Sequence, residues 1–327
     1  MLQDIAALYS GNLALFSGTV FVLGLLVGSF LNVVIYRLPI MLEREWREQA
    51  DALVAGEPAP DVAATAAAAT AAALTAAAPR FNLGTPRSTC PACKAPITAW
   101  QNIPVVSWLM LRGRCAACQT SISARYPVVE LLTAILSAWV ACHFGFGWPA
   151  ACALFVTWSL IALTGIDIDH QLLPDNITLP LLWAGLLASV LIGGAAIGAA
   201  GVGGAAHATS LPVAPATAII GAAAGYLSLW LIFHLFKLIT GKEGMGYGDF
   251  KLYAALGAWL GWKVLPLIIL LSAATGAVLG IAMILIKGRD KSAPMPFGPY
   301  LAAAGWLAMM YGDSIIGGYL RVSGLAR

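Results

Sequence analysis

Four aspartates lie at the ends of long apolar runs in this 327-residue chain: Asp167, Asp169 and Asp175 after one run, and Asp249 before another. Ionisable side chains in or beside membrane-spanning segments are costly and usually functional. Two carboxylates held close together cannot both ionise easily, so they share one proton. One can then act as a general base on water while the other polarises a peptide carbonyl. The pattern therefore indicates aspartic-protease chemistry, which needs neither a metal nor a cofactor.

Asp249 closes a glycine-rich stretch of the sequence. Glycines beside a carboxylate allow backbone and substrate to approach it closely, and they permit backbone angles that other residues avoid. A helix start alone would also favour an acid after a glycine. It would not explain why glycine recurs at Gly241, Gly244, Gly246 and Gly248. We therefore interpret Gly246 and Gly248 as support for an active-site loop that ends in Asp249.

The partner of Asp249 is not fixed by spacing, because Asp167 and Asp169 follow the same apolar run. On a helix Asp167 and His170 share a face, so a metal site is conceivable, although a polar interfacial role for His170 is favoured. The remaining histidines are scattered and form no ligand cluster with it. Asp175 follows a proline and can be explained as a cap of the next helix.

Four of the six cysteines form two Cys-x-x-Cys pairs in the longest hydrophilic stretch. Each pair can bind one face of a tetrahedral ion, and two pairs complete a closed structural Zn²⁺ site. If the stretch is cytoplasmic, its thiols are kept reduced, which favours a metal over disulfides. Two disulfides or four unrelated thiols are the alternatives. The expected zinc ligands are Cys90, Cys93, Cys115 and Cys118.

The composition indicates which elements must position these residues. Hydrophobic residues make up 60% of the chain and charged residues 10%, and the mean hydropathy is +0.84, whereas soluble domains carry roughly 25% charged residues. No cluster of lysine and arginine with interleaved aromatics supports a nucleic-acid partner. We predict an all-α polytopic membrane protein in a lipid bilayer, with about eight transmembrane helices near 13–36, 127–143, 150–166, 176–195, 214–236, 250–262, 264–286 and 299–317.

The basic residues orient these helices. All but three of the 18 lysines and arginines fall in the segments 37–125, 237–251 and 287–291. Positive residues concentrate in cytoplasmic loops, so we place these segments in the cytoplasm and the N-terminus in the periplasm. This orientation brings Asp167 and Asp249 to the cytoplasmic face of the membrane. No basic residue precedes the first apolar run, so we expect the first helix to be retained rather than removed as a signal peptide.

The chain divides into three parts on these grounds. Residues 1–37 hold the first transmembrane helix, residues 38–125 form a cytoplasmic domain inserted after it, and residues 126–327 form the transmembrane protease core. The cytoplasmic domain carries the four-cysteine site and an alanine-rich stretch at 59–78. Because this stretch has too few large apolar side chains to build a core, we interpret it as a linker. A further transmembrane helix is the alternative.

Together the motifs resemble those of the type IV prepilin peptidase family, also called prepilin leader peptidase/N-methyltransferases. The glycine-rich stretch and the stretch around Asp167 are the most specific, and the alanine-rich stretch 59–78 is the main departure. The similar stretches follow the family's order along nearly the whole chain: GSFLNVVIYRLP (28–39), the four-cysteine pattern, QNIP (101–104), RYPVVE (125–130), IDIDHQLLPD (166–175), GKEGMGYGDFK (241–251) and PFGPY (296–300).

The resemblance implies that the catalytic pair is Asp167 and Asp249. It implies an aspartic endopeptidase that removes the basic leader of type IV prepilins and type II secretion pseudopilins after a glycine. Members with the four-cysteine domain also N-methylate the new N-terminus with S-adenosylmethionine, so this activity is expected here, although the sequence assigns no residues to binding the methyl donor. The implied location is the bacterial inner membrane, with several passes and the active site at the cytoplasmic face.

A proton-coupled transporter is the strongest alternative function, because intramembrane acids also mark ion pathways. Transporters place such acids near the bilayer midplane, between repeated halves of the chain. Here the acids lie at the predicted cytoplasmic edge, and the sequence shows no repeated halves. The distribution of the acids therefore favours the protease.

Overall fold

The computed structural model describes residues 2–54, 81–98, 100–193, 211–242, 244–287 and 295–324. Within these ranges the chain is helical apart from loops and two isolated β-bridges, as the all-α prediction requires. The alanine-rich stretch 59–78, predicted to be a linker, lies outside the described residues. The structure divides into two compact units, one of Met1–Gly24 with Leu132–Arg327 and the other of Leu25–Leu131.

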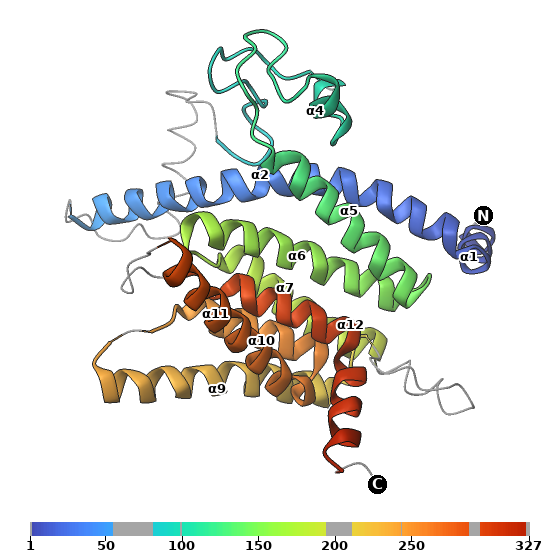
Figure 1. Ribbon diagram of the computed structural model, residues 1–327, viewed down its shortest axis with the longest axis vertical. Helices are drawn as coiled ribbons and strands as arrows, with labels where there is room; N and C mark the ends of the chain where they lie inside the picture. The colour runs from blue at the N-terminus through green and yellow to red at the C-terminus, as the bar shows by residue number, and fades with distance from the viewer. Residues whose placement is uncertain are drawn as a thin grey trace, which may run out of the picture. The chain divides into compact units, whose positions relative to one another are not determined.

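The first unit consists of helices, most of them long and apolar (Figure 1). It begins with α1 (Leu2–Gly11) and the first residues of α2 (Leu13–Val54), and it resumes within α5 (Arg125–Phe144). Then follow α6 (Trp148–His170), α7 (Asp175–Ala188), the π-helical turn η2 (Ser189–Gly193), α9 (Pro215–Thr240), α10 (Tyr247–Leu260), the 3₁₀ turn η3 (Trp262–Val264), α11 (Leu265–Lys287) and α12 (Gly298–Val322). Each of the eight predicted apolar runs is therefore helical over most of the residues that the structure describes.

The prediction of eight transmembrane helices is supported only in part. α10 has 14 residues, fewer than the roughly 20 that one crossing needs. α12 has 25 residues, but many of them are small or polar. In the described part of the chain, six helices are long and apolar enough to cross a membrane: Leu13–Val54, Arg125–Phe144, Trp148–His170, Asp175–Gly193, Pro215–Thr240 and Trp262–Ile286.

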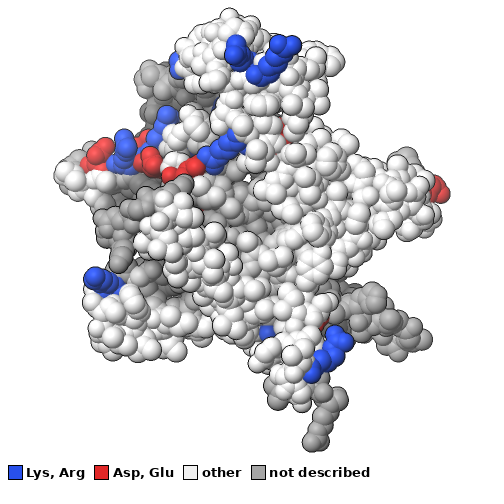
Figure 2. Space-filling model, viewed as in Figure 1, with Lys and Arg blue, Asp and Glu red and all other residues white. Residues whose placement is uncertain are grey.

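α2 extends well beyond the predicted end of the first helix at residue 36. It continues to Val54 with Pro39 inside it. The residues after Pro39 are rich in Leu, Glu, Arg, Gln and Ala, which have high helix propensity, so the helix continues as a polar, exposed segment. Figure 2 shows charged side chains of both signs on this part of α2, whereas the helices of the first unit carry charge mainly near their ends.

α10 is buried along nearly its whole length. Phe250 and every residue from Leu252 to Leu260 are buried, and the helix packs against α7, α9 and α12 (Figure 1). Because most of this helix is surrounded by protein, its short length is compatible with a place inside the helical bundle. The helix begins at Tyr247, three residues before the predicted run, and so includes Asp249 in its first turn.

Glycines allow α10 to lie directly against α9. A Cβ atom on Gly225 of α9 would lie 2.7 Å from the carbonyl oxygen of Tyr253. One turn earlier on α9, Gly221 faces Gly257 of α10, and neither position has room for a side chain. Small residues at a helix interface let the two backbones approach closely, so this contact fixes the position of α10.

The second unit joins the later part of α2 to the cysteine-bearing segment. Arg37 of α2 is buried and donates hydrogen bonds to the carbonyl oxygens of Asn82 at 2.8 Å and Pro86 at 2.7 Å. The ring of Phe81 lies 5.5 Å from the guanidinium of Arg37 and 4.4 Å from that of Arg44. These contacts attach the segment to α2. The unit also contains η1 (Trp100–Asn102) and α4 (Val106–Met110).

Candidate functional site

Asp167 lies in the last turn of α6 and is buried, with 5% of its surface exposed. It lies among the buried residues of α6, which include Leu163 and Ile166. Asp169, the other candidate from the same run, is exposed, as is His170. The structure thus places Asp167 and Asp169 in different environments, and it does not bring His170 into a metal-ligand cluster among the described residues.

Asp249 lies in the first turn of α10 and is 7% exposed. Its carboxylate experiences the charge of Asp167, so the two predicted catalytic residues are brought together from α6 and α10. The N–H of Asp249 donates a hydrogen bond of 3.2 Å to the carbonyl oxygen of Gly246. A Cβ atom on Gly248 would lie 2.7 Å from Cβ of Leu173, so glycine at this position lets the first turn of α10 approach the chain segment that follows α6.

Gly298, the first residue of α12, completes the surroundings of Asp167. Its backbone N–H donates a hydrogen bond of 3.0 Å to Oδ2 of Asp167. A Cβ atom at this position would lie 2.6 Å from the same oxygen, so only glycine fits without a shift. The N-terminus of a helix favours a carboxylate. The sequence analysis assigned no role to Gly298. The PFGPY motif, in which a proline follows Gly298 at the start of a helix, could have drawn attention to this residue.

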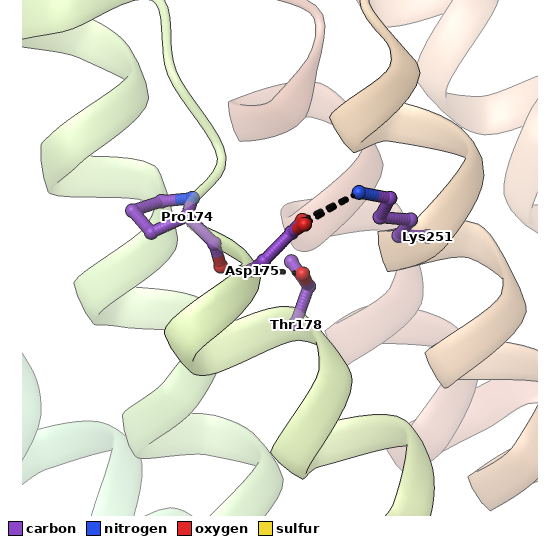
Figure 3. A network of polar contacts seen from close by, with 4 residues as sticks. All are labelled: Pro174, Asp175, Thr178 and Lys251. Atoms are coloured by element: carbon purple, nitrogen blue, oxygen red, sulfur yellow. Dashed lines mark hydrogen bonds and ion pairs between the residues drawn. The ribbon is translucent and has the colours of Figure 1, made fainter. Parts of the chain in front are cut away.

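Asp175 is the first residue of α7, but the interpretation of it as a cap is wrong: the N-cap position is Pro174, and no side chain makes a capping hydrogen bond. The carboxylate of Asp175 is engaged elsewhere. Both of its oxygens lie 2.7 Å from Nζ of Lys251 on α10, as Figure 3 shows. Beside it, the hydroxyl of Thr178 donates to the carbonyl oxygen of Pro174 at 3.2 Å (Figure 3). The ion pair therefore joins the start of α7 to α10, two residues after Asp249.

Removing this ion pair should have a small effect. The side chains of Lys251 and Asp175 are 29% and 50% exposed, and pairs of this kind contribute roughly 0–1 kcal/mol. We expect Asp175→Asn or Lys251→Gln to change the rate of peptide cleavage by no more than about fivefold, which corresponds to about 1 kcal/mol. Cleavage assays on both single variants and the double variant measure this. A loss of more than about 100-fold in either single variant would contradict a purely structural pair.

The four predicted zinc ligands come together in the second unit. Their Sγ atoms all lie within 4.8 Å of one another, with Cys90 3.8 Å from Cys118 and Cys93 4.0 Å from Cys115. Four sulfurs around Zn²⁺ at about 2.3 Å lie about 3.8 Å apart, so the donor set fits this ion. All four cysteines are free, and the sulfurs are too far apart for the roughly 2.05 Å bond of a disulfide.

Two equivalent turns carry these cysteines. In the first, the N–H of Cys90 donates to the carbonyl of Ala95 at 2.9 Å, and in the second the N–H of Cys115 donates to Thr120 at 2.8 Å. Each turn contains one residue with positive φ, at Lys94 and Gln119. Hydrogen bonding with Thr120 lowers the pKa of Cys118 to about 6. Because the two turns have the same backbone geometry, the sulfurs of both cysteine pairs point toward one common centre.

One further buried acid was not singled out from the sequence. Glu130 of α5 accepts a hydrogen bond of 2.7 Å from the N–H of Val105. Val105 has a φ of 59°, an unusual value for a β-branched residue. Nearby, the amide of Asn32 donates to the carbonyl of Tyr126 at 3.0 Å. These contacts hold α2, α5 and the loop before α4 together within the second unit.

Two family models match the chain. Residues 22–144 match the bacterial peptidase A24 N-terminal domain, and residues 154–281 match the type IV leader peptidase family. Both glycines of the predicted active-site loop and both central aspartates fall within the second match. No solved structure matches the chain.

Curated relatives match the chain along most of its length. A protein of Aeromonas salmonicida is 52% identical over 307 residues, which cover 94% of each chain. Proteins of Pseudomonas aeruginosa and Neisseria gonorrhoeae are 49% and 47% identical, with 92% and 90% of each chain covered. All three bear the name prepilin leader peptidase/N-methyltransferase.

Proposed function

The chain belongs to the type IV leader peptidase family, and on that premise we propose that Asp167 and Asp249 are its catalytic pair. Like its relatives, it is a membrane enzyme that cleaves the leader peptide from prepilins and N-methylates the product. The observation that supports the pair is the burial of two carboxylates from α6 and α10 within reach of each other's charge. Gly246, which precedes α10, and Gly248, in its first turn, support the position of Asp249.

The pair performs the cleavage with one shared proton. The ionised carboxylate takes a proton from water, and the oxygen of that water attacks the peptide carbonyl carbon. The protonated carboxyl donates a hydrogen bond to the carbonyl oxygen and so stabilises the charge that develops there. The amine leaves with a proton from the pair, and one shared proton remains. The hydrogen bond from Gly298 fixes the orientation of Asp167 while this occurs.

The enzyme acts at the cytoplasmic face of the bacterial inner membrane, which is the side that the distribution of basic residues favours. Its substrates are prepilins and type II secretion pseudopilins, which it cuts after a glycine. Residues 1–37, 38–125 and 126–327 form its first helix, its cytoplasmic domain and its protease core. Incubation of the purified protein with a prepilin tests this, because cleavage shifts the mobility of the prepilin on a gel. A transporter would produce no shift, and the relatives favour the peptidase.

Cys90, Cys93, Cys115 and Cys118 would hold a structural Zn²⁺. Four sulfur ligands would fill its coordination sphere, so the ion would cross-link the two cysteine turns without binding a substrate. The methyl donor for N-methylation is S-adenosylmethionine. We assign no residues to its binding.

Replacing Gly298 with alanine should slow cleavage without unfolding the protein. The added Cβ would lie 2.6 Å from Oδ2 of Asp167, so the carboxylate or α12 must shift by a few tenths of an ångström or more. A displacement of about 1 Å near the reacting groups costs about 100-fold in rate. We therefore expect kcat to fall by about 10- to 100-fold, as a prepilin cleavage assay can measure.

Gly318→Ala is the matched control for this change, because Gly318 lies on the same helix and nothing lies within 4 Å of its added Cβ. It should cleave at the wild-type rate. If Gly298→Ala also retained the wild-type rate, the orientation of Asp167 by this residue would be disproved.

A further inference from the structure

Leu173 lies in the short segment that joins α6 to α7, and it is buried, with 7% of its surface exposed. Residues on both sides of it fix the path of this segment. Gln171, which ends α6, has a φ of 52°, and its N–H donates to the carbonyl oxygen of Asp167 at 2.9 Å. Pro174 follows Leu173, and a residue before proline is restricted to extended backbone. The position of Leu173 is therefore tied to the last turn of α6, which carries Asp167.

Leu173 packs against the start of α10. A Cβ atom on Gly248 would lie 2.7 Å from Cβ of Leu173, 3.3 Å from its carbonyl oxygen and 3.5 Å from its Cδ1. Gly248 directly precedes Asp249 in the first turn of α10. The leucine therefore touches the backbone that carries the second aspartate of the proposed catalytic pair.

The same side chain packs against the start of α12. A Cβ atom on Gly298 would lie 3.1 Å from Cδ2 of Leu173 and 2.6 Å from Oδ2 of Asp167. The N–H of Gly298 binds that oxygen at 3.0 Å. One methyl group of Leu173 thus faces the neighbour of Asp249, and the other faces the residue that orients Asp167. A side chain that branches at Cγ makes both contacts at once.

We propose that Leu173 is a positioning residue of the peptidase, whose two methyl groups set the spacing between Asp167 and Asp249. The proposal rests on the assignment of these two aspartates as the catalytic pair. Two carboxylates share one proton only while they lie close together, and the interaction of two charges falls with their separation. The two glycines leave no room for a Cβ atom beside the leucine. A change in the shape of Leu173 therefore moves the backbone next to one or both acids.

Two changes at Leu173 test the proposal in a prepilin cleavage assay. Leu173→Ala removes both methyl groups, so we expect kcat to fall by about 100-fold, the cost of a displacement of about 1 Å. Leu173→Ile keeps the volume and suits extended backbone, but it moves the branch from Cγ to Cβ. We expect kcat of this variant to fall by about 10-fold. KM should stay within about twofold in both variants, because Leu173 holds the catalytic pair and not the substrate.

Leu154→Ala is the matched control. Leu154 lies on α6, 13 residues before Asp167, and its exposed fraction is also 7%. Its replacement leaves a cavity in the core, so it should lower the thermal unfolding midpoint as Leu173→Ala does. It should nevertheless retain the wild-type kcat, because it touches neither of the segments that carry the aspartates. A purely structural role of Leu173 would make the two alanine variants alike in both measurements.

If Leu173→Ala does not fold, Leu173→Ile decides, since exchanges that conserve volume in a core cost little stability. A wild-type kcat in Leu173→Ile would overturn the positioning role, because the leucine would then only fill space. A rise in KM with kcat unchanged would also overturn it, because the side chain would then act on substrate binding. In each of these outcomes Asp167→Asn and Asp249→Asn remain inactive. Failure of this proposal is therefore distinguishable from failure of the catalytic pair, in which those two variants would cleave prepilin.

Discussion

Asparagine in place of Asp167 or Asp249 should lower kcat for prepilin cleavage by about 10⁴-fold or more, the upper end of what one positioned acid or base contributes. Each variant keeps the size of the side chain but cannot take up or release a proton. The remaining carboxylate cannot serve as base and acid at the same time. Because the two residues act as a unit, the double variant should be no slower than the slower single variant.

Asp169→Asn is the matched control, because Asp169 is exposed two residues from Asp167 on the same helix. It should retain most of the wild-type rate. Both active-site variants should also remain in the membrane and fold, since each replaces one of two buried carboxyl groups with an uncharged amide of the same size. The assignment fails if Asp249→Asn cleaves prepilin at close to the wild-type rate.

Serine at any of the four clustered cysteines should release one Zn²⁺ per chain and unfold the cysteine-bearing segment. The binding free energy of structural Zn²⁺ is about 10–16 kcal/mol in zinc-finger peptides, and in a small segment this free energy is also folding free energy. Elemental analysis measures the metal, and limited proteolysis reports the unfolding through new cuts in residues 81–124. Chelation of the wild-type protein should produce the same cuts.

Cys142→Ser is the control for this series. Cys142 is an exposed cysteine of α5 outside the cluster, so its replacement should leave the zinc content at one per chain. Purified wild-type protein without zinc, or with disulfides by thiol titration, would refute the structural site.

The sequence located the helices but not the orientation of α6. Residues two positions apart on a helix project about 200° apart, so Asp167 and Asp169 cannot face the same way. Deciding between them from the residues alone requires an amphipathic pattern, and α6 is apolar on all sides. The resemblance to a family chose Asp167, and the structure independently places that residue in the interior.

Contacts between residues that lie far apart in the chain could not be predicted from the sequence pattern. Gly298 and Asp167 are separated by 131 residues, and nothing local to either residue indicates the other. The pairing of Asp175 with Lys251 was missed for the same reason, since a helix start explained Asp175 adequately. The four cysteines were predictable because each Cys-x-x-Cys pair is a local unit whose chemistry requires a second pair.

The position of Gly298 has a consequence for the timing of synthesis. The ribosome makes α6 and α10 before α12. Gly298 follows Asp249 by 49 residues, so at about 5–20 residues per second the interval between them is roughly 2.5–10 s. During that interval a nascent chain already contains both aspartates but not the glycine that orients one of them. We expect the peptidase to gain full activity only when α12 docks.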